Sequence, residues 1–270
     1  MKKLNIQTLK KAIPAILLGI TTIAVNAQKL PNVQKDGVRA PADIKVDGKA
    51  TEWNNQFQAY NHATDVFYTI ANDDNNLYLT IQATDPAIIR KILNGGITFT
   101  INTADKKNDQ EGASITYPIF EKNNRMTVIF RNKPEIIPGS EISIKKADSF
   151  MYANNKRMTD LTKLIKTSGI KAMDTLISVY NEDGIKASAL FDNKMNYTYE
   201  LAISLKNMEM AVSNPVKFAY NVRINAVESK GITVEKSDSG EPTKIRISAG
   251  AQAGQDATDF WGEYTLAKNN

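Results

Sequence analysis

A stretch of alternating side chains, Thr64–Asp85, constrains the fold of this chain more than any other segment. Apolar side chains occupy every second position from Val66 to Ile70 and again from Leu77 to Ala83. This spacing is typical of half-buried antiparallel strands. Between the two runs lies an Asn/Asp cluster at 72–76, a composition that favours turns by hydrogen-bonding its own backbone. The segment therefore predicts two strands joined by a turn, with one apolar face and one polar face.

The same alternation returns in later segments and indicates the fold class. It is clear in Ile97–Asn102, Tyr197–Leu205 and Phe218–Ala226, and Phe260–Leu266 predicts a closing strand. Two further hairpins are expected, one joining 115–120 to 126–132 and one joining 176–180 to 185–191 through Asp183-Gly184. About ten strands at nearly regular spacing predict an all-β protein, a single antiparallel β-sandwich with immunoglobulin-like or jelly-roll-like layers.

The remaining segments are expected to be less regular. Residues 28–42 form an N-terminal arm, 43–270 form the sandwich, and 134–194 form an insertion within it. In the insertion Ile142 and Ile144 suggest a short strand, and a short helix is expected from Thr159 or Asp160 to about 167. One or two helical turns are also expected between Asp85-Pro86 and Gly95. Trp53, after the Asp47-Gly48 turn, is expected to plug one end of the core; the other interpretation is a platform for stacking a sugar.

The first 27 residues have the pattern of a cleavable signal peptide. Four lysines, at positions 2, 3, 10 and 11, precede a mostly apolar segment at 13–25, and Val25-Asn26-Ala27 supplies a small residue at the cleavage site. The apolar run is too short to be a transmembrane anchor, and no cysteine follows that could carry a lipid. The sequence thus predicts a periplasmic or extracellular protein.

Composition narrows the classes of function. The chain has a net charge of +5, but four of the positive charges are signal lysines, so the remainder is nearly neutral and nucleic acid is not an expected partner. The chain has no cysteine, which excludes disulfides, iron–sulfur clusters and cysteine–zinc sites. Stability must therefore come from a hydrophobic core.

Four stretches, in this order, resemble the family 9 carbohydrate-binding modules of the wider DOMON-like group. They are Ile44–Gly48 with Glu52-Trp53, Asn72–Asp85, Tyr197–Leu205 and Trp261–Leu266. The resemblance implies a non-catalytic module that binds a mono- or oligosaccharide and often carries structural calcium. The chain departs from the family in having only two tryptophans, because family members clamp a sugar between two exposed ones. A shared fold does not by itself transfer the ligand.

Polar rows on alternating strands supply the candidate binding residues. If the strands share one sheet, their amides, guanidinium and carboxylate would gather on an open face and suit sugar hydroxyls. The alternative is a solvated face on which Arg223 and Glu200 form an ion pair. The residues assigned to the glycan site are Tyr78, Gln82, Asn102, Glu200, Asn221, Arg223 and Asn225, with Thr80, Thr98 and Thr100 beside them.

Metal, haem and enzyme sites have weaker support. Asp73, Asp74 and Asp85, with Asn75, Asp105 and Asp109 as further donors, offer hard oxygen ligands for a structural calcium, although such residues also serve turn geometry. His62 is the single histidine, which leaves haem with at most a histidine–methionine pair. No spacing matches a serine hydrolase, a paired-carboxylate glycosidase, a P-loop or a dinucleotide site. No cofactor is therefore certain.

These observations favour an exported, non-catalytic carbohydrate-binding protein that recognises its glycan on a polar sheet face. The alternative is a structural or protein-interaction β-sandwich of the cell envelope with no small ligand. The sequence determines neither the sugar nor the oligomeric state.

Overall fold

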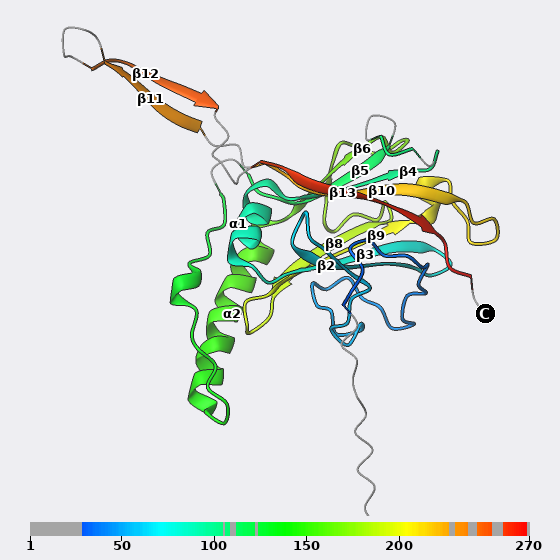
Figure 1. Ribbon diagram of the computed structural model, residues 1–270, viewed down its shortest axis with the longest axis horizontal. Helices are drawn as coiled ribbons and strands as arrows, with labels where there is room; N and C mark the ends of the chain where they lie inside the picture. Colours follow the sequence, from blue (N-terminus) through cyan, green and yellow to red (C-terminus); the bar gives the residue numbers. More distant parts are fainter. Residues whose placement is uncertain are drawn as a thin grey trace, which may run out of the picture.

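The computed structural model describes residues 29–104, 106–108, 112–121, 124–226, 230–236, 242–249 and 256–268. They form a sandwich of two antiparallel sheets, which confirms the predicted all-β class (Figure 1). The five-stranded sheet has the order β1-β2-β3-β9-β8 and the six-stranded sheet the order β13-β10-β4-β5-β6-β7. The bounds are β1 Ala59–Asn61, β2 Val66–Asn72, β3 Asn76–Ala83, β8 Ile185–Phe191 and β9 Tyr197–Ser204, then β4 Ile97–Asn102, β5 Ala113–Ile119, β6 Leu164–Ser168, β7 Leu176–Ser178, β10 Lys217–Ile224 and β13 Thr258–Thr265.

The core lies between the sheets and is filled by the apolar positions of the alternating strands. In β9 the inward side chains include Tyr197, Tyr199 and Leu201, and in β10 they include Tyr220 and Val222, all of them buried. A one-residue slip of any strand would turn its whole apolar set outward, so the buried face fixes the register. The strand pairing predicted for Thr64–Asp85 is confirmed, with β2 antiparallel to β3.

The outer face of the five-stranded sheet is covered by the segment 43–58. Trp53 and Phe57 from this segment, with Ala50, form a small second core against Ala71 of β2. Trp53 is buried, as the core interpretation required, but it packs on the outer face of the sheet and does not plug an end of the main core. The polar row of this face is consequently not open to solvent along its length.

The insertion differs most from the sequence prediction. Helix α2 runs over Glu141–Leu161, so Ile142 and Ile144 lie in a helix, and the expected helix near 159–167 is wrong because α2 ends there and β6 begins. Residues 126–132 form no strand beside β5; only the short 3-10 helix η1, Phe130–Asn132, follows. The hairpin expected through Asp183-Gly184 is also wrong, because β7 and β8 belong to different sheets.

The helical segment expected between Asp85-Pro86 and Gly95 is confirmed. Helix α1, Pro86–Gly95, is capped by Asp85, whose side chain accepts hydrogen bonds from the backbone N–H groups of Ala87 and Ile88. A 3-10 helix, η2 (Leu205–Met208), follows β9, and strands β11 (Lys230–Lys236) and β12 (Pro242–Ala249) pair as a separate two-stranded sheet. Among the described residues, no helix has the length and apolar character needed to cross a membrane.

Asn72, at the end of β2, joins three parts of the chain. It is fully buried, and its side-chain Oδ1 accepts hydrogen bonds from the Tyr264 hydroxyl at 3.1 Å and from the Ala267 N–H at 2.8 Å. Its Nδ2 donates to the Ala267 carbonyl, and its backbone N–H donates to the Val38 carbonyl. The N-terminal arm, the five-stranded sheet and the segment after β13 are therefore held together at one amide.

Candidate functional site

The residues predicted to share one polar face divide between the two sheets. Tyr78 and Gln82 lie on β3 and Glu200 on β9, in the five-stranded sheet. Asn102 lies on β4, and Asn221, Arg223 and Asn225 lie on or just after β10, in the six-stranded sheet. The expected single face is therefore wrong, because alternation specifies which positions share a face within a sheet but not which strands share a sheet.

Two of the three residues on the five-stranded sheet, Tyr78 and Glu200, are buried beneath other segments of the same polypeptide. The Tyr78 hydroxyl donates to Asp73 Oδ2 at 2.7 Å, and burial together with this carboxylate raises the pKa of Tyr78 to about 12. Glu200 is 2% exposed and lies beneath the Asp47-Gly48 turn. Gln82 alone of the three is half-buried, and its Nε2 donates to Thr198 Oγ1 at 3.3 Å.

Glu200 fixes the covering turn to the sheet. Its Oε2 accepts hydrogen bonds from the backbone N–H groups of Asp47 and Gly48, each at 2.9 Å, while its buried Oε1 has no hydrogen-bond partner in the structure described. Gly48 has φ +84° and comes so close to β8 that a Cβ would lie 2.8 Å from the Leu190 nitrogen. Burial raises the pKa of Glu200 to about 7, more than the two hydrogen bonds lower it.

The three asparagines among the four residues on the six-stranded sheet form hydrogen bonds with neighbouring groups of the protein. Asn102 is buried and donates to the Asn108 carbonyl. Asn221 is buried too and donates to Asp259 Oδ2 at 2.7 Å and to the Phe260 carbonyl. Asn225 donates to the Gly95 carbonyl and to Thr98 Oγ1. Arg223 is exposed in register with Thr98 and Asp259.

The aspartates proposed as calcium ligands do not meet in one site. Asp73 Oδ1 accepts hydrogen bonds from the N–H groups of Asn75 and Asn76, and its Oδ2 accepts from the Tyr78 hydroxyl of β3. Asp74 pairs with Arg39 at 2.9 Å. Asp85 caps α1 beyond the other end of β3. Asp105 and Asp109 lie outside the described residues. In the described ranges, no group of three or more His, Cys, Asp or Glu residues is arranged to hold a metal ion.

The structure reveals a hollow beside Gln82 that the sequence did not predict. We call it the Gln82 pocket; its volume is about 640 Å³. Gln82 and Thr198 project into it from β3 and β9, so part of the predicted polar row does reach a cavity. One wall is the 48–55 turn, which contributes Lys49, Thr51 and Asn55. The polar sheet positions thus form the floor of a pocket whose walls come from other segments.

The second wall is the inner side of helix α2 where it packs on β8. Asn155 forms a paired contact there: its Nδ2 donates to the Phe191 carbonyl, and its Oδ1 accepts from the Phe191 N–H at 2.7 Å. One and two turns before it, Met151 and Asp148 also line the pocket. An asparagine in the middle of a helix is a poor helix former, but no helix was predicted over residue 155, so nothing in the sequence pointed to this role.

The third wall is the turn at 192–196 between β8 and β9. Asp192 Oδ1 accepts hydrogen bonds from the N–H groups of Lys194 and Asn196, and its Oδ2 accepts from Asn196 Nδ2. Asn193 donates to Asp148 Oδ1 at 3.4 Å, so this turn is joined to α2. The pocket consequently offers amides, hydroxyls, carboxylates and two lysines, Lys49 and Lys194, around apolar surface from Ala50, Met151 and Leu190.

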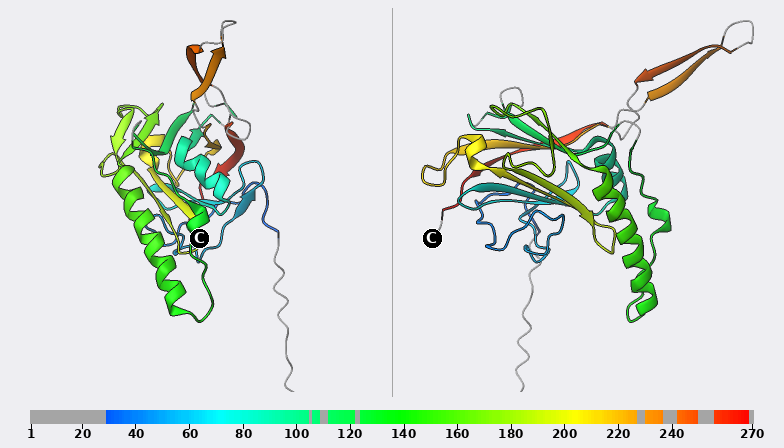
Figure 2. Two further views of the ribbon diagram at one scale, coloured as in Figure 1. Left: turned by 90° about the vertical axis from the view of Figure 1, so that its left-hand side faces the viewer. Right: turned by 180° about the vertical axis from the view of Figure 1, so that it is seen from behind.

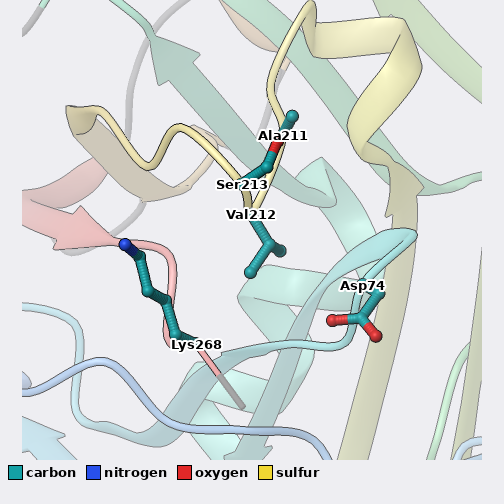
Figure 3. Close-up of a pocket in the computed structure, with 5 residues that line it drawn as sticks. All are labelled: Asp74, Ala211, Val212, Ser213 and Lys268. Carbon is teal, nitrogen blue, oxygen red and sulfur yellow. The ribbon is translucent and has the colours of Figure 1, made fainter.

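A second hollow, of about 440 Å³, lies where the 73–75 turn meets residues 211–213 and Lys268 (Figure 3). Val212 points into the space between Asp74 and Lys268, and the Lys268 ammonium extends away from Asp74. The carboxylate of Asp74 is already paired with Arg39. This hollow has fewer polar groups than the Gln82 pocket, which we therefore regard as the stronger candidate site.

The fold and the site together define an antiparallel β-sandwich with a polar pocket on the outer face of its five-stranded sheet. In comparisons with known proteins, no family model matches the chain and no curated protein matches it significantly.

Proposed function

We propose that this protein is an exported, non-catalytic carbohydrate-binding protein that takes a mono- or oligosaccharide in the Gln82 pocket. The observation that carries the proposal is the composition of this pocket, in which amide, hydroxyl and charged side chains from four segments stand beside apolar surface from Ala50, Met151 and Leu190. Binding pockets for small ligands combine apolar lining with a few fixed polar groups in this way. The resemblance to family 9 carbohydrate-binding modules supports the same ligand class.

The pocket groups match the needs of a sugar. Each hydroxyl of a sugar both donates and accepts, so it requires donors and acceptors in fixed directions. Asn155 and Asp192 are held by paired hydrogen bonds to the backbone, which fixes the walls before a ligand arrives. Gln82 keeps its Oε1 available to a ligand, since the one hydrogen bond found for its side chain uses Nε2. Preorganised walls reduce the entropy lost on binding.

The first prediction tests this site by thermal shift. We expect the protein to melt at a higher temperature with at least one member of a panel of glucose, galactose, mannose and β1,4-linked disaccharides, because a ligand of the native state stabilises it. Thr198→Val removes one hydroxyl at nearly constant shape, Gln82→Ala removes an amide, and Asn55→Gly removes an amide at a position with φ +54°. Each change should weaken binding by about tenfold, measured by titration calorimetry.

Arg223→Ala is the matched control. It removes a polar side chain assigned to the glycan site from the other sheet, and it should leave the affinity unchanged. Loss of binding in Arg223→Ala, with binding retained in the three pocket variants, would place the site on the outer face of the six-stranded sheet. Absence of any shift across the panel and a wider glycan array would reject carbohydrate binding.

A further inference from the structure

Exposed apolar side chains are concentrated around one end of helix α2. In the part of the chain that the structure describes, eight large apolar side chains are exposed, and five of them fall between residues 129 and 152. Ile142 is 70% exposed and Ile137 is 54% exposed. Exposed apolar side chains that gather in one part of a molecule mark a candidate site of interaction with a protein or a membrane. The five residues are Ile129, Ile137, Ile142, Ile144 and Tyr152.

One face of α2 combines this apolar surface with positive charge. Residues separated by three, four, seven and eight positions share a helix face, which places five residues together on what we call the basic face: Ile142, Lys145, Lys146, Ser149 and Phe150. With Pro134, these five residues line an open hollow of about 570 Å³ that has no acidic residue in its lining. The same spacing places Lys156 and Arg157 further along this face.

The acidic residues of α2 neutralise this charge only in part. Glu141 lies 3.9 Å from Lys145, and both side chains are largely exposed, so the pair is weak. Asp160 pairs with Lys156 at 2.9 Å. Asp148 lies on the other side of the helix, where it lines the Gln82 pocket. Lys146 and Arg157 have no acidic partner within 4.0 Å in the described ranges, which leaves the face positive.

Apart from Phe150, which packs against the core, the basic face points away from the sandwich. Asn155 and Met151, on the opposite side of α2, face β8 and the Gln82 pocket. Figures 1 and 2 show that one half of α2 extends past the edge of the sheets, together with the segment that precedes it. The Ser143 hydroxyl bonds the backbone of Ile137 to the first turn of the helix, which holds Ile137 close to the start of α2. These apolar residues therefore lie at a projecting end that a flat surface can reach.

We propose that the basic face of α2 docks the protein on an anionic membrane surface. Ile137 and Ile142 would enter the boundary between headgroups and acyl chains, while Lys145 and Lys146 would meet the phosphates. Amphipathic helices with lysines on the polar face lie in the membrane interface in this way, and lysine stems cover apolar surface while their ammonium groups remain in water. Charge complementarity favours an anionic bilayer over an apolar protein partner, and the projecting position favours a surface over a small ligand.

Vesicle sedimentation tests the proposal. The protein is purified after export, its N-terminus is established by mass spectrometry, and its binding to vesicles of phosphatidylcholine alone is compared with binding to equal parts phosphatidylcholine and phosphatidylglycerol. We expect binding to the anionic vesicles alone, weakened by salt. The double variant Lys145→Glu, Lys146→Glu should lower the partition coefficient by about thirtyfold or more. Ile142→Ser should lower it by about tenfold.

A matched control replaces one exposed apolar residue and one exposed lysine on another surface of the protein. Leu176 and Lys166 are exposed cross-strand neighbours on β7 and β6, and Leu176→Ser with Lys166→Glu should leave vesicle binding unchanged. Equal binding to neutral and anionic vesicles, no binding to either, or equal losses in the control and the α2 variants would overturn the proposal. So would a dimer, measured by light scattering without lipid, that Ile142→Ser converts to monomer, because a second copy would then cover the face. All of these readouts are independent of glycan binding.

Discussion

Replacing Gly262 with alanine is expected to destabilise the protein by about 3 kcal/mol, measured as the free energy of unfolding in urea. Gly262 lies on β13 directly opposite Tyr220 of β10. A Cβ at this position would overlap Cζ and the hydroxyl oxygen of Tyr220 and lie 2.7 Å from its Cε1. Tyr220 is fully buried, and its hydroxyl bonds that of Tyr68 at 3.0 Å. The ring therefore has no space to move without breaking a buried polar contact.

The sign of the effect is itself informative. Glycine in a strand interior is ordinarily less stable than alanine by about 0.5–1 kcal/mol, so without the clash the substitution would stabilise the protein. Tyr220→Leu should make Gly262→Ala less costly in a double-mutant cycle, because leucine leaves room for the new methyl group. Gly139→Ala serves as a control: its Cβ meets nothing within 4 Å, but its φ of +80° should cost about 1 kcal/mol. Unchanged or increased stability in Gly262→Ala would contradict the packing of β13 on β10.

Glu200→Gln is expected to make the protein more stable at pH 8 and to change its stability by less than about 1 kcal/mol at pH 5. The pKa of Glu200 rises from an ordinary value of 4.5 to about 7 on burial. The folded state therefore binds the proton more tightly than the unfolded state, and stability falls as pH rises from about 4.5 to about 7 and then levels off. At 1.36 kcal/mol per pKa unit, the loss is on the order of 3 kcal/mol.

Glutamine is a suitable mimic of the protonated acid. One oxygen of Glu200 accepts both backbone hydrogen bonds, and the glutamine carbonyl can do the same without a charge. Unfolding free energies at pH 5, 6, 7 and 8 should decline less in Glu200→Gln than in the natural protein. The exposed Glu135→Gln is the matched control and should leave the pH profile unaltered. Parallel profiles for the natural protein and Glu200→Gln would show that Glu200 is ionised in the folded protein throughout this range.

Local chemistry determined the parts of the fold that the sequence could predict. The alternation in Thr64–Asp85 and Tyr197–Leu205 specified strands and their buried faces, and Asp85-Pro86 specified the start of α1. Helix α2 was not predicted, because its apolar residues are few and far apart. Its buried face consists of Ser143, Ala147 and Met158, which is too small to produce a clear helical period of apolar residues in the sequence. Asp183-Gly184 predicted a turn correctly, but a turn can also carry the chain from one sheet to the other.

The candidate site was predictable only in part, for a related reason. Gln82 was identified because alternation places it on the polar face of β3. Its partners in the pocket come from α2, from the 48–55 turn and from the 192–196 turn, which only the tertiary fold brings together. Glu200 was identified as a polar-face residue as well, but its burial depends on a turn more than 150 positions earlier in the chain. Sequence periodicity contains no information about such covering segments.

The hydrogen bonds of Asn72 bear on when this chain can fold. The carbonyl and N–H of Ala267, 195 positions later, both bond to the Asn72 side chain, and Val38 bonds to its backbone. Pairings this remote in sequence must wait for the intervening chain, which makes folding slow. The Asn72 network in particular cannot form before residue 267 has been synthesised. A chain shortened at its carboxyl end, before Ala267, would leave the buried Asn72 amide without two of its hydrogen-bond partners.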